Sequence, residues 1–218
     1  RCFISDYFLA WNEYTKDEMI KEGIDSNRVR VLGIPQYAGA EFTVNKDRDS
    51  DKRNIFGVIL DIPSEQERNE RLIKFANVLS KEFGLKYKLR YHPNAKKNEF
   101  DGILDDQFYN GFIDNSVSIY DYSREVDFTI MDSSSVYIEL ILLNHTTFRY
   151  STQDVHDKYL GVTENTFSNV EMLFSLYKNP EAVSNNLASL TERLNVKTSI
   201  LKNYEEFYKC IVISKNKK

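Results

Sequence analysis

The sequence predicts an α/β fold in which helices flank a parallel sheet, and three observations support this prediction. Apolar, strand-like segments alternate with helix-like segments from residue 55 onward, which is the pattern of βαβ units with right-handed crossovers. The segment 55–62 is apolar almost throughout, as expected of a parallel strand covered on both faces. A chain of 218 residues with 41% hydrophobic residues is also long enough to bury a substantial core.

The first part of the chain predicts a strand–helix–strand series. The expected elements are a strand over 3–11, a helix over 15–22 and a strand over 28–32. Asn12 or Thr15 can cap the helix, and Gly23 ends it. The stretch 45–54 follows, with seven charged residues in ten and no aliphatic residue. We therefore expect it to be a solvated linker and the best domain boundary.

The remaining elements follow this charged stretch. Strands are expected at 55–62, 85–91, 117–120, 127–131 and 146–150, and helices at 136–143, 168–177, 180–194 and 199–213. A further helix is expected after residue 63, because Ser64 and Glu67 form a capping box. Its apolar stripe comprises Leu72, Ala76, Leu79 and Phe83, and Gly84 ends it. Residues 94–115 predict irregular structure with one or two helices, and 123–126 at most one helical turn.

Composition excludes several classes of protein. Lys plus Arg is 29 and Asp plus Glu is 33, giving a net charge of −4, which argues against a general nucleic-acid binder. No apolar run approaches the roughly 20 residues of a membrane-spanning helix. No Cys-x-x-Cys occurs and the three histidines are scattered, so no metal site is expected. The glycine fingerprints of dinucleotide-binding proteins and P-loop ATPases are also absent, as is the Gly-x-Ser-x-Gly of α/β-hydrolases.

The strongest candidate site is a serine-rich turn. In parallel sheets, ligands bind beyond the carboxyl ends of the strands. One expected strand ends at Asp132-Ser133-Ser134-Ser135, just before a helix. Free amides at a helix start and serine hydroxyls together suit a phosphate or another anion. The alternative is that one serine is an ordinary helix cap and the others fill a turn.

The second candidate is His92-Pro93, at the carboxyl end of the strand over 85–91. Imidazole can donate a hydrogen bond to a phosphate oxygen, and Pro93 ends strand pairing where a ligand would lie. The alternative is a surface histidine beside a turn proline. Glu139, four residues after Ser135, could accept hydrogen bonds from ribose hydroxyls, or it could be a solvated helix residue.

These motifs, in this order, resemble the carboxyl-terminal half of GT-B glycosyltransferases. CDP-glycerol glycerophosphotransferases and GT-B sialyltransferases of bacteria pair an HP motif with a Ser-Ser or Ser-Thr motif. In those enzymes the histidine and the serines contact the phosphate of a cytidine nucleotide donor. The matching positions are His92, Pro93, Ser133, Ser134 and Ser135. A second match lies upstream, where residues 6–11, a helix, Gly23-Ile24 and the sequence RVRVLGIP over 28–35 resemble the end of the amino-terminal GT-B domain.

The resemblance implies a Rossmann-like, donor-binding domain with a helical C-terminal segment. It implies a remnant of the amino-terminal domain over 1–44, a charged linker over 45–54 and a nucleotide-sugar-binding domain over 55–218. The general base would lie in the missing half, so we expect the chain to be inactive alone. His92 would stabilise the leaving phosphate, and the donor would contact His92, Pro93, Ser133, Ser134, Ser135 and Glu139.

The resemblance also implies partners and a setting. The donor would be a CMP-, CDP- or UDP-linked sugar, the acceptor a glycan or a lipid-linked molecule, and neither metal nor cofactor would be needed. The expected setting is cytoplasmic synthesis of bacterial capsule or another surface polysaccharide, with peripheral association at the inner face of the membrane left open. Three alternatives to a glycosyltransferase stand beside this reading: a CDP-alditol glycerophosphotransferase of teichoic-acid type, a UDP-sugar 2-epimerase-like isomerase, and a non-enzymatic interaction domain.

Overall fold

The computed structural model describes residues 5–35, 54–93, 111–113, 118–132, 134–151, 165–193 and 200–215. The chain divides into two compact units. The first unit contains the described residues up to 35 together with 188–193 and 200–215. The second contains the described residues from 54 to 187.

The second unit is built on a six-stranded, all-parallel sheet with the order β5-β4-β3-β6-β7-β8. In chain order the strands are β3 (Ile55–Ile59), β4 (Lys86–Arg90), β5 (Gly111–Ile113), β6 (Thr129–Met131), β7 (Thr147–Tyr150) and β8 (Thr166–Phe167). Counted within the unit, the strand order is 3-2-1-4-5-6, which is that of a doubly wound Rossmann-like sheet. The predicted α/β fold with a parallel sheet is therefore confirmed.

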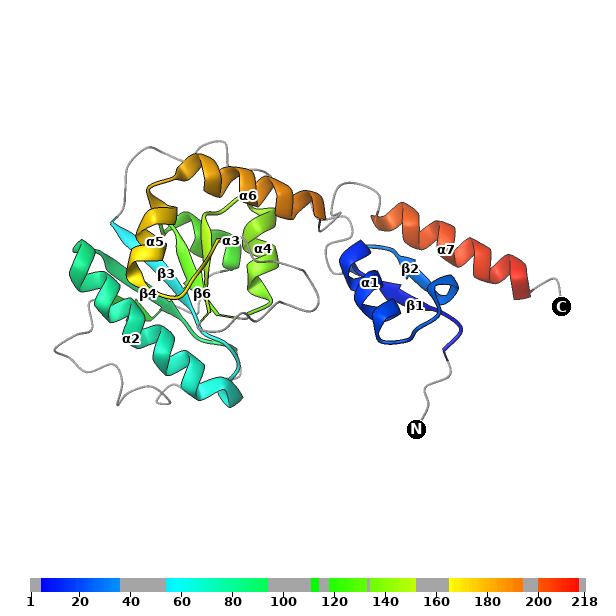
Figure 1. Ribbon diagram of the computed structural model, residues 1–218, viewed down its shortest axis with the longest axis horizontal. Coiled ribbons are helices and arrows are strands. Elements are labelled where there is room, and N and C mark those ends of the chain that lie inside the picture. The colour runs from blue at the N-terminus through cyan, green and yellow to red at the C-terminus, as the bar shows by residue number, and fades with distance from the viewer. Residues whose placement is uncertain are drawn as a thin grey trace. The chain divides into compact units, whose positions relative to one another are not determined.

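Helices cover both faces of this sheet (Figure 1). The helices α2 (Gln66–Phe83) and α5 (Val170–Tyr177) lie on one face, and α3 (Ile119–Arg124) and α4 (Val136–Leu142) lie on the other. Helix α2 makes aromatic contacts with both α5 and the sheet. The rings of Phe83 in α2 and Phe174 in α5 are 5.1 Å apart, and Phe75 of α2 lies 5.1 Å from Tyr150 of β7. The helix α6 (Pro180–Arg193) follows α5.

The central strands form the core because both of their faces are covered. Phe56 and Val58 of β3 are fully buried, and so is Ile130 of β6. Val58 lies opposite Leu89 on one side and opposite Ile130 on the other. Continuous burial along β3 agrees with the unbroken apolar character of its sequence.

Helix α2 has the apolar stripe and the end that the sequence predicts. Leu72, Ala76 and Leu79 are buried, and Phe83 is half-buried. Gly84 ends the helix with a φ of 64°, a left-handed conformation that glycine adopts without steric cost.

The predicted start of this helix is wrong. The structure has a 3₁₀ turn over Pro63–Glu65, and α2 begins only at Gln66, with no side-chain cap. Ser64 is exposed within the turn, so it does not form the predicted capping box with Glu67. Proline at the first position of the turn fixes a φ suited to a tight helical start.

The predicted strand over 117–120 is also wrong. Ser118 instead caps α3: its hydroxyl oxygen accepts a hydrogen bond from the amide of Asp121 at 3.1 Å and donates one to the Asp121 carboxylate at 2.7 Å. The strand of this region is β5, inside the segment predicted to be irregular. The two-residue strand β8 is a further addition to the predicted elements, and 94–110 lie outside the described residues.

The first unit contains a strand–helix–strand series, as predicted. Strand β1 (Phe8–Ala10) pairs in parallel with β2 (Val29–Val31), and α1 (Glu13–Lys21) connects them. The Asn12 side chain caps α1 by accepting from the amide of Thr15 at 2.8 Å. The C-terminal helix α7 (Ile200–Lys215) also belongs to this unit. The domain boundaries expected from the resemblance stay a prediction, and 45–53 of the predicted linker lie outside the described residues.

Candidate functional site

The strand order defines where a ligand would bind in the second unit. In a doubly wound sheet, the crevice lies at the carboxyl edge, at the point where the strand order reverses. Here that point lies between β3 and β6, which pair through Ile59 and Met131. Strand β4 flanks β3 on its other side. The turns after β4, β3 and β6 therefore lie side by side at the edge where the sequence analysis placed its candidates.

His92-Pro93 follows the end of β4. The strand ends at Arg90, whose carbonyl oxygen accepts a hydrogen bond from the Leu60 amide at 3.0 Å. Tyr91 is buried, His92 is half-buried and Pro93 is exposed. The structure thus places the imidazole at the carboxyl edge of the sheet, one strand away from the switch point.

The serine-rich turn follows the end of β6. Ser133 lies outside the described residues. Ser134 is buried and Ser135 is exposed, and their carbonyl oxygens accept from the amides of Tyr137 and Ile138 at 3.1 Å each, which begins α4. Ser135 occupies the cap position, but its side chain makes no capping hydrogen bond. This geometry disfavours an ordinary cap role for Ser135.

Helix α4 is short, so its dipole contributes little to the predicted anion site. It has seven residues, about two turns, so only a small helix field adds to the hydroxyl groups. Glu139 is half-buried within α4, and its carbonyl oxygen accepts from the amide of Leu143 at 3.0 Å. The role of the Glu139 carboxylate stays a prediction.

Three arginines near the serine-rich turn were not predicted. Burial raises the pKa of Asp132 above the ordinary value of 3.8, the positive charges of Arg68 and Arg149 oppose this rise, and Asp61 adds to it. Arg149 is itself buried in β7, and its Nε donates to the carbonyl oxygen of Asp132 at 3.1 Å. Arg71 of α2 is a weaker influence of the same sign as Arg68. Arg149 therefore contacts the carboxyl end of β6, and Arg68 and Arg71 lie close enough for their charges to act on the Asp132 carboxyl group.

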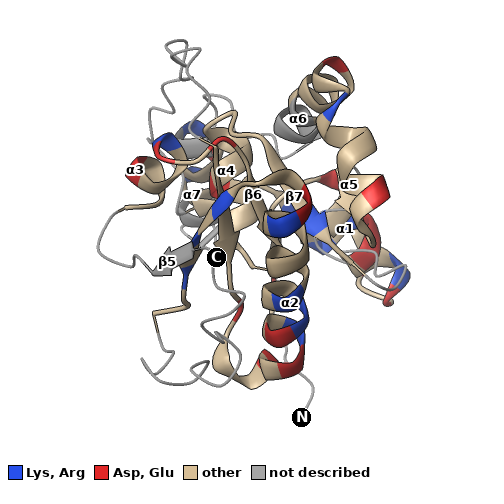
Figure 2. Cartoon of the chain, turned by 90° about the vertical axis from the view of Figure 1, so that its left-hand side faces the viewer, with Lys and Arg blue, Asp and Glu red and all other residues tan. Residues whose placement is uncertain are grey.

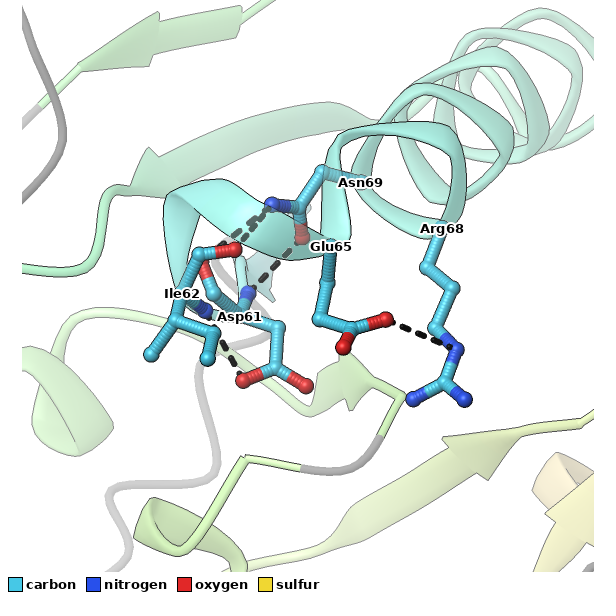
Figure 3. A network of polar contacts seen from close by, with 5 residues as sticks. All are labelled: Asp61, Ile62, Glu65, Arg68 and Asn69. Atoms are coloured by element: carbon cyan, nitrogen blue, oxygen red, sulfur yellow. Dashed lines mark hydrogen bonds and ion pairs between the residues drawn. The ribbon is translucent and has the colours of Figure 1, made fainter.

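One signal in the sequence could have identified Arg68 and Arg71. The start of a helix carries a partial positive charge, so basic residues in its first turns are unfavourable unless an anion lies nearby. Both arginines lie within the first six residues of α2. Arg68 pairs with Glu65 at 3.3 Å (Figure 3). Acidic and basic residues are mixed along α2 (Figure 2), so this helix does not present a field of one sign.

Two further searches cover the residues that the structure describes. Within the described ranges, no group of three or more His, Cys, Asp or Glu side chains could hold a metal ion. Among the helices described, none has both the length and the apolar character that crossing a membrane requires.

Comparison with known proteins identifies the architecture. No protein-family model and no curated protein matches the sequence. Among solved structures, the chain is similar to a variant of the wall teichoic acid polymerase TagF soaked with CDPG, with 20% identity over 97% of this chain and 57% of that chain and a TM-score of 0.51. It is also similar to the UDP-GlcNAc 2-epimerase of Methanocaldococcus jannaschii in complex with UDP-GlcNAc and UDP, with 18% identity over 86% of this chain and 61% of that chain and a TM-score of 0.55.

A third similar structure is TarM, with 9% identity over 94% of this chain and 43% of that chain and a TM-score of 0.61. The chain spans less than two thirds of the length of each of these proteins. At these identities the likeness establishes the fold alone. The chain therefore contains a Rossmann-like α/β domain similar to those of these three structures.

Proposed function

We propose that the chain is the donor-binding half of a GT-B glycosyltransferase and binds a nucleotide-activated sugar. One observation carries the proposal: His92 and the pair Ser134-Ser135 end the two strands that flank β3, at the carboxyl edge. Neighbouring strands are about 4.8 Å apart, so the ends of the two strands that carry the motifs are about 10 Å apart. A phosphate group between them would match the hydrogen-bond donors that both motifs offer.

The chemistry follows from the charge on the leaving group. A nucleotide phosphate gains negative charge as its bond to the sugar breaks, and hydrogen-bond donors fixed where that charge develops lower the barrier. His92 and the serine hydroxyls would supply these donors without a metal ion. Loss of one donor of this kind typically reduces the rate by about 10²–10³-fold. We place the general base in a further domain, so the chain alone should bind the donor but not transfer it.

The donor is proposed to be CMP-, CDP- or UDP-linked, and the acceptor to be a glycan or a lipid-linked molecule. The resemblance of the HP and serine motifs to capsule, teichoic-acid and sialyltransferase enzymes supports a role in bacterial surface polysaccharide synthesis. Such an enzyme would work in the cytoplasm, at the inner face of the membrane. A CDP-alditol glycerophosphotransferase is the variant of this proposal that the fold similarity to TagF favours.

A UDP-sugar 2-epimerase-like isomerase is the second candidate. The fold similarity to the Methanocaldococcus jannaschii UDP-GlcNAc 2-epimerase favours it. The two candidates differ in the nucleotide that they would select, because a glycerophosphotransferase requires a cytidine donor and this type of epimerase requires a uridine donor. A non-enzymatic interaction domain would bind neither.

Calorimetric titration of the 218-residue chain with CMP, CDP, UDP and GDP tests the proposal. We expect one base to be preferred, and we expect His92→Ala and Ser134→Ala each to weaken that binding by at least tenfold. The matched control is Ser123→Ala, which removes another buried serine hydroxyl, one that donates to the Tyr120 carbonyl at 2.7 Å, in α3. Binding by none of the four nucleotides to a folded chain would contradict the proposal.

A further inference from the structure

Asn69 holds the turn at the end of β3 through three hydrogen bonds (Figure 3). The residue lies in α2 and is only 1% exposed. Its Oδ1 accepts from the amide of Asp61 at 2.8 Å, and its Nδ2 donates to the carbonyl oxygens of Asp61 and Ile62 at 3.2 and 3.3 Å. One side chain thus satisfies the backbone of two consecutive residues just beyond the strand.

These bonds hold the backbone that follows the pairing of β3 with β4. A bond from the Leu60 amide to the Arg90 carbonyl, at 3.0 Å, continues that pairing one residue beyond β3. The amide and the carbonyl of the next residue, Asp61, both pair with the Asn69 side chain. This is possible because an amide side chain carries one acceptor and two donors.

The position of this turn follows from the strand order. β3 lies between β4 and β6, so any group held by both His92 and Ser134 must lie across the end of β3. The backbone at that end is the segment that Asn69 fixes. Ile62 is 41% exposed there, and its amide donates to the Asp61 carboxylate at 2.8 Å, which limits the freedom of that side chain. In Figure 3 the Asp61 and Ile62 side chains point away from α2.

We propose that Asn69 is a positioning residue that fixes the turn over 61–65 directly beneath the phosphate of the bound nucleotide donor, with Ile62 facing that donor. This inference rests on the proposed function. It adds the turn over 61–65 to the candidate site, between His92 and the pair Ser134-Ser135. Asn69 touches the protein backbone and acts through it, whereas Ile62 touches the ligand.

The first test compares Asn69→Ala with Asn77→Ala by titration with the nucleotide that the wild-type chain prefers. Asn77 lies eight residues further along α2, about 12 Å from Asn69, and accepts from the Tyr87 hydroxyl at 2.7 Å. Both variants lose a hydrogen-bonded amide from the same helix, so both should unfold at a lower temperature. At a temperature where both are folded, we expect Asn69→Ala to bind at least tenfold more weakly and Asn77→Ala to bind as wild type.

The second test requires no change in the protein interior. Ile62→Glu puts a negative charge at the proposed position of the phosphate, and Val78→Glu puts the same charge on an equally exposed aliphatic position of α2, where Val78 is 46% exposed. We expect Ile62→Glu to weaken binding by at least fivefold, and less so at high salt because salt screens the repulsion. Val78→Glu should leave the affinity unchanged.

These results separate the failure of this inference from failure of the proposed function. If the wild-type chain binds no nucleotide, both the inference and the proposed function are contradicted. If it binds a nucleotide and His92→Ala weakens that binding, but Ile62→Glu and a folded Asn69→Ala bind as wild type, only the role of the turn is overturned. Should Asn69→Ala not fold, Ile62→Glu alone decides, and unchanged affinity of that variant rejects the inference.

Discussion

Asp132 is a half-buried carboxyl group at the end of β6 where burial and nearby charge oppose each other. Burial favours the neutral form and raises its pKa, and Arg68 and Arg149 reduce this rise. The two arginines thus moderate the cost of charging the half-buried Asp132 carboxyl group. With a phosphate bound beside this carboxylate, as proposed, they would also offset the repulsion between the two negative charges.

The raised pKa of Asp132 predicts a pH-dependent stability. The folded state holds the Asp132 proton more tightly than the unfolded state, so the contribution is full below the ordinary pKa of 3.8 and is lost as the pH rises through the folded pKa. Asp132→Asn removes the ionisation and keeps the backbone carbonyl that Arg149 contacts. We expect a higher melting temperature than wild type at pH 7 and no advantage below about pH 4, measured by thermal denaturation. An equal advantage at both pH values would contradict this.

Gly57 of β3 occupies a position where a larger side chain would clash with its neighbours. A Cβ at this position would lie 2.9 Å from the Thr129 hydroxyl and 2.9 Å from the Tyr122 ring. The Tyr122 hydroxyl reaches between β3 and β4, where it accepts from the amide of Val58 at 3.1 Å and donates to the carbonyl of Lys88. Glycine therefore makes room for a tyrosine that bridges the two central strands.

Gly57→Ala is expected to destabilise the second unit by about 1–3 kcal/mol, the usual cost of overpacking a core. The clash with the Tyr122 ring should couple the two positions. In a double-mutant cycle with Tyr122→Leu, measured by denaturant unfolding, we expect the combined loss to be smaller than the sum of the single losses. Strictly additive losses would show that the two side chains do not meet.

At the scale of elements, the strongly patterned segments were predictable, and so were the short strands β1, β2 and β6, whereas the edge strands β5 and β8 were not. The stripe of Leu72, Ala76 and Leu79 and the final Gly84 together identify α2, because burial and chain reversal demand those residue types. Strand β5 has three residues and β8 has two. Pairing with neighbours far along the chain creates such strands, and a local pattern cannot reveal this.

Helix α3 shows how capping can override apolar character. Ile119 and Tyr120 look strand-like, but the Ser118 hydroxyl pairs with Asp121 and starts a helix. The site shows a similar division. The location of His92 and Ser134 just after strand ends was predictable from the sequence, whereas Arg149 reaches the carbonyl of Asp132 only through the pairing of β6 with β7.

Two serines test this account of helix starts. Ser118→Ala should destabilise the protein by about 1 kcal/mol, because the cap of α3 is lost. Ser64→Ala should change stability by less than about 0.5 kcal/mol, since Ser64 is exposed and caps no helix. Chemical denaturation of the two variants beside wild type measures both. A larger loss for Ser64→Ala would indicate that Ser64 caps α2 after all, and would contradict the structure.

At the scale of the whole molecule, the two ends of the chain belong to one unit. Tyr7, just before β1, meets Phe207 of α7 with ring centroids 5.4 Å apart in an edge-on arrangement. A sheet of two parallel strands is too small to be stable by itself. The C-terminal helix therefore supplies apolar contact that β1 and β2 need, across nearly the full length of the sequence.

Phe207→Ala should loosen the first unit and leave the second intact. We expect faster amide hydrogen exchange in β1 and β2 and unchanged exchange in β3 and β6, because local opening follows the loss of buried apolar contact. The neighbouring variant Tyr208→Ala is the control, since Tyr208 is 69% exposed. Exchange that rises equally in both variants, or rises in β3 as well, would argue against this role of Phe207.

The two outer strands of the six-stranded sheet carry a consequence for self-association. As described, β5 and β8 contribute only three and two residues to the edges. An unpaired strand edge is a template for pairing with another chain, and natural proteins blunt it by keeping edge strands short. Within the described residues, these edges therefore offer few amides and carbonyls in a row to a second molecule. Short edges of this kind limit edge-to-edge aggregation of the parallel core.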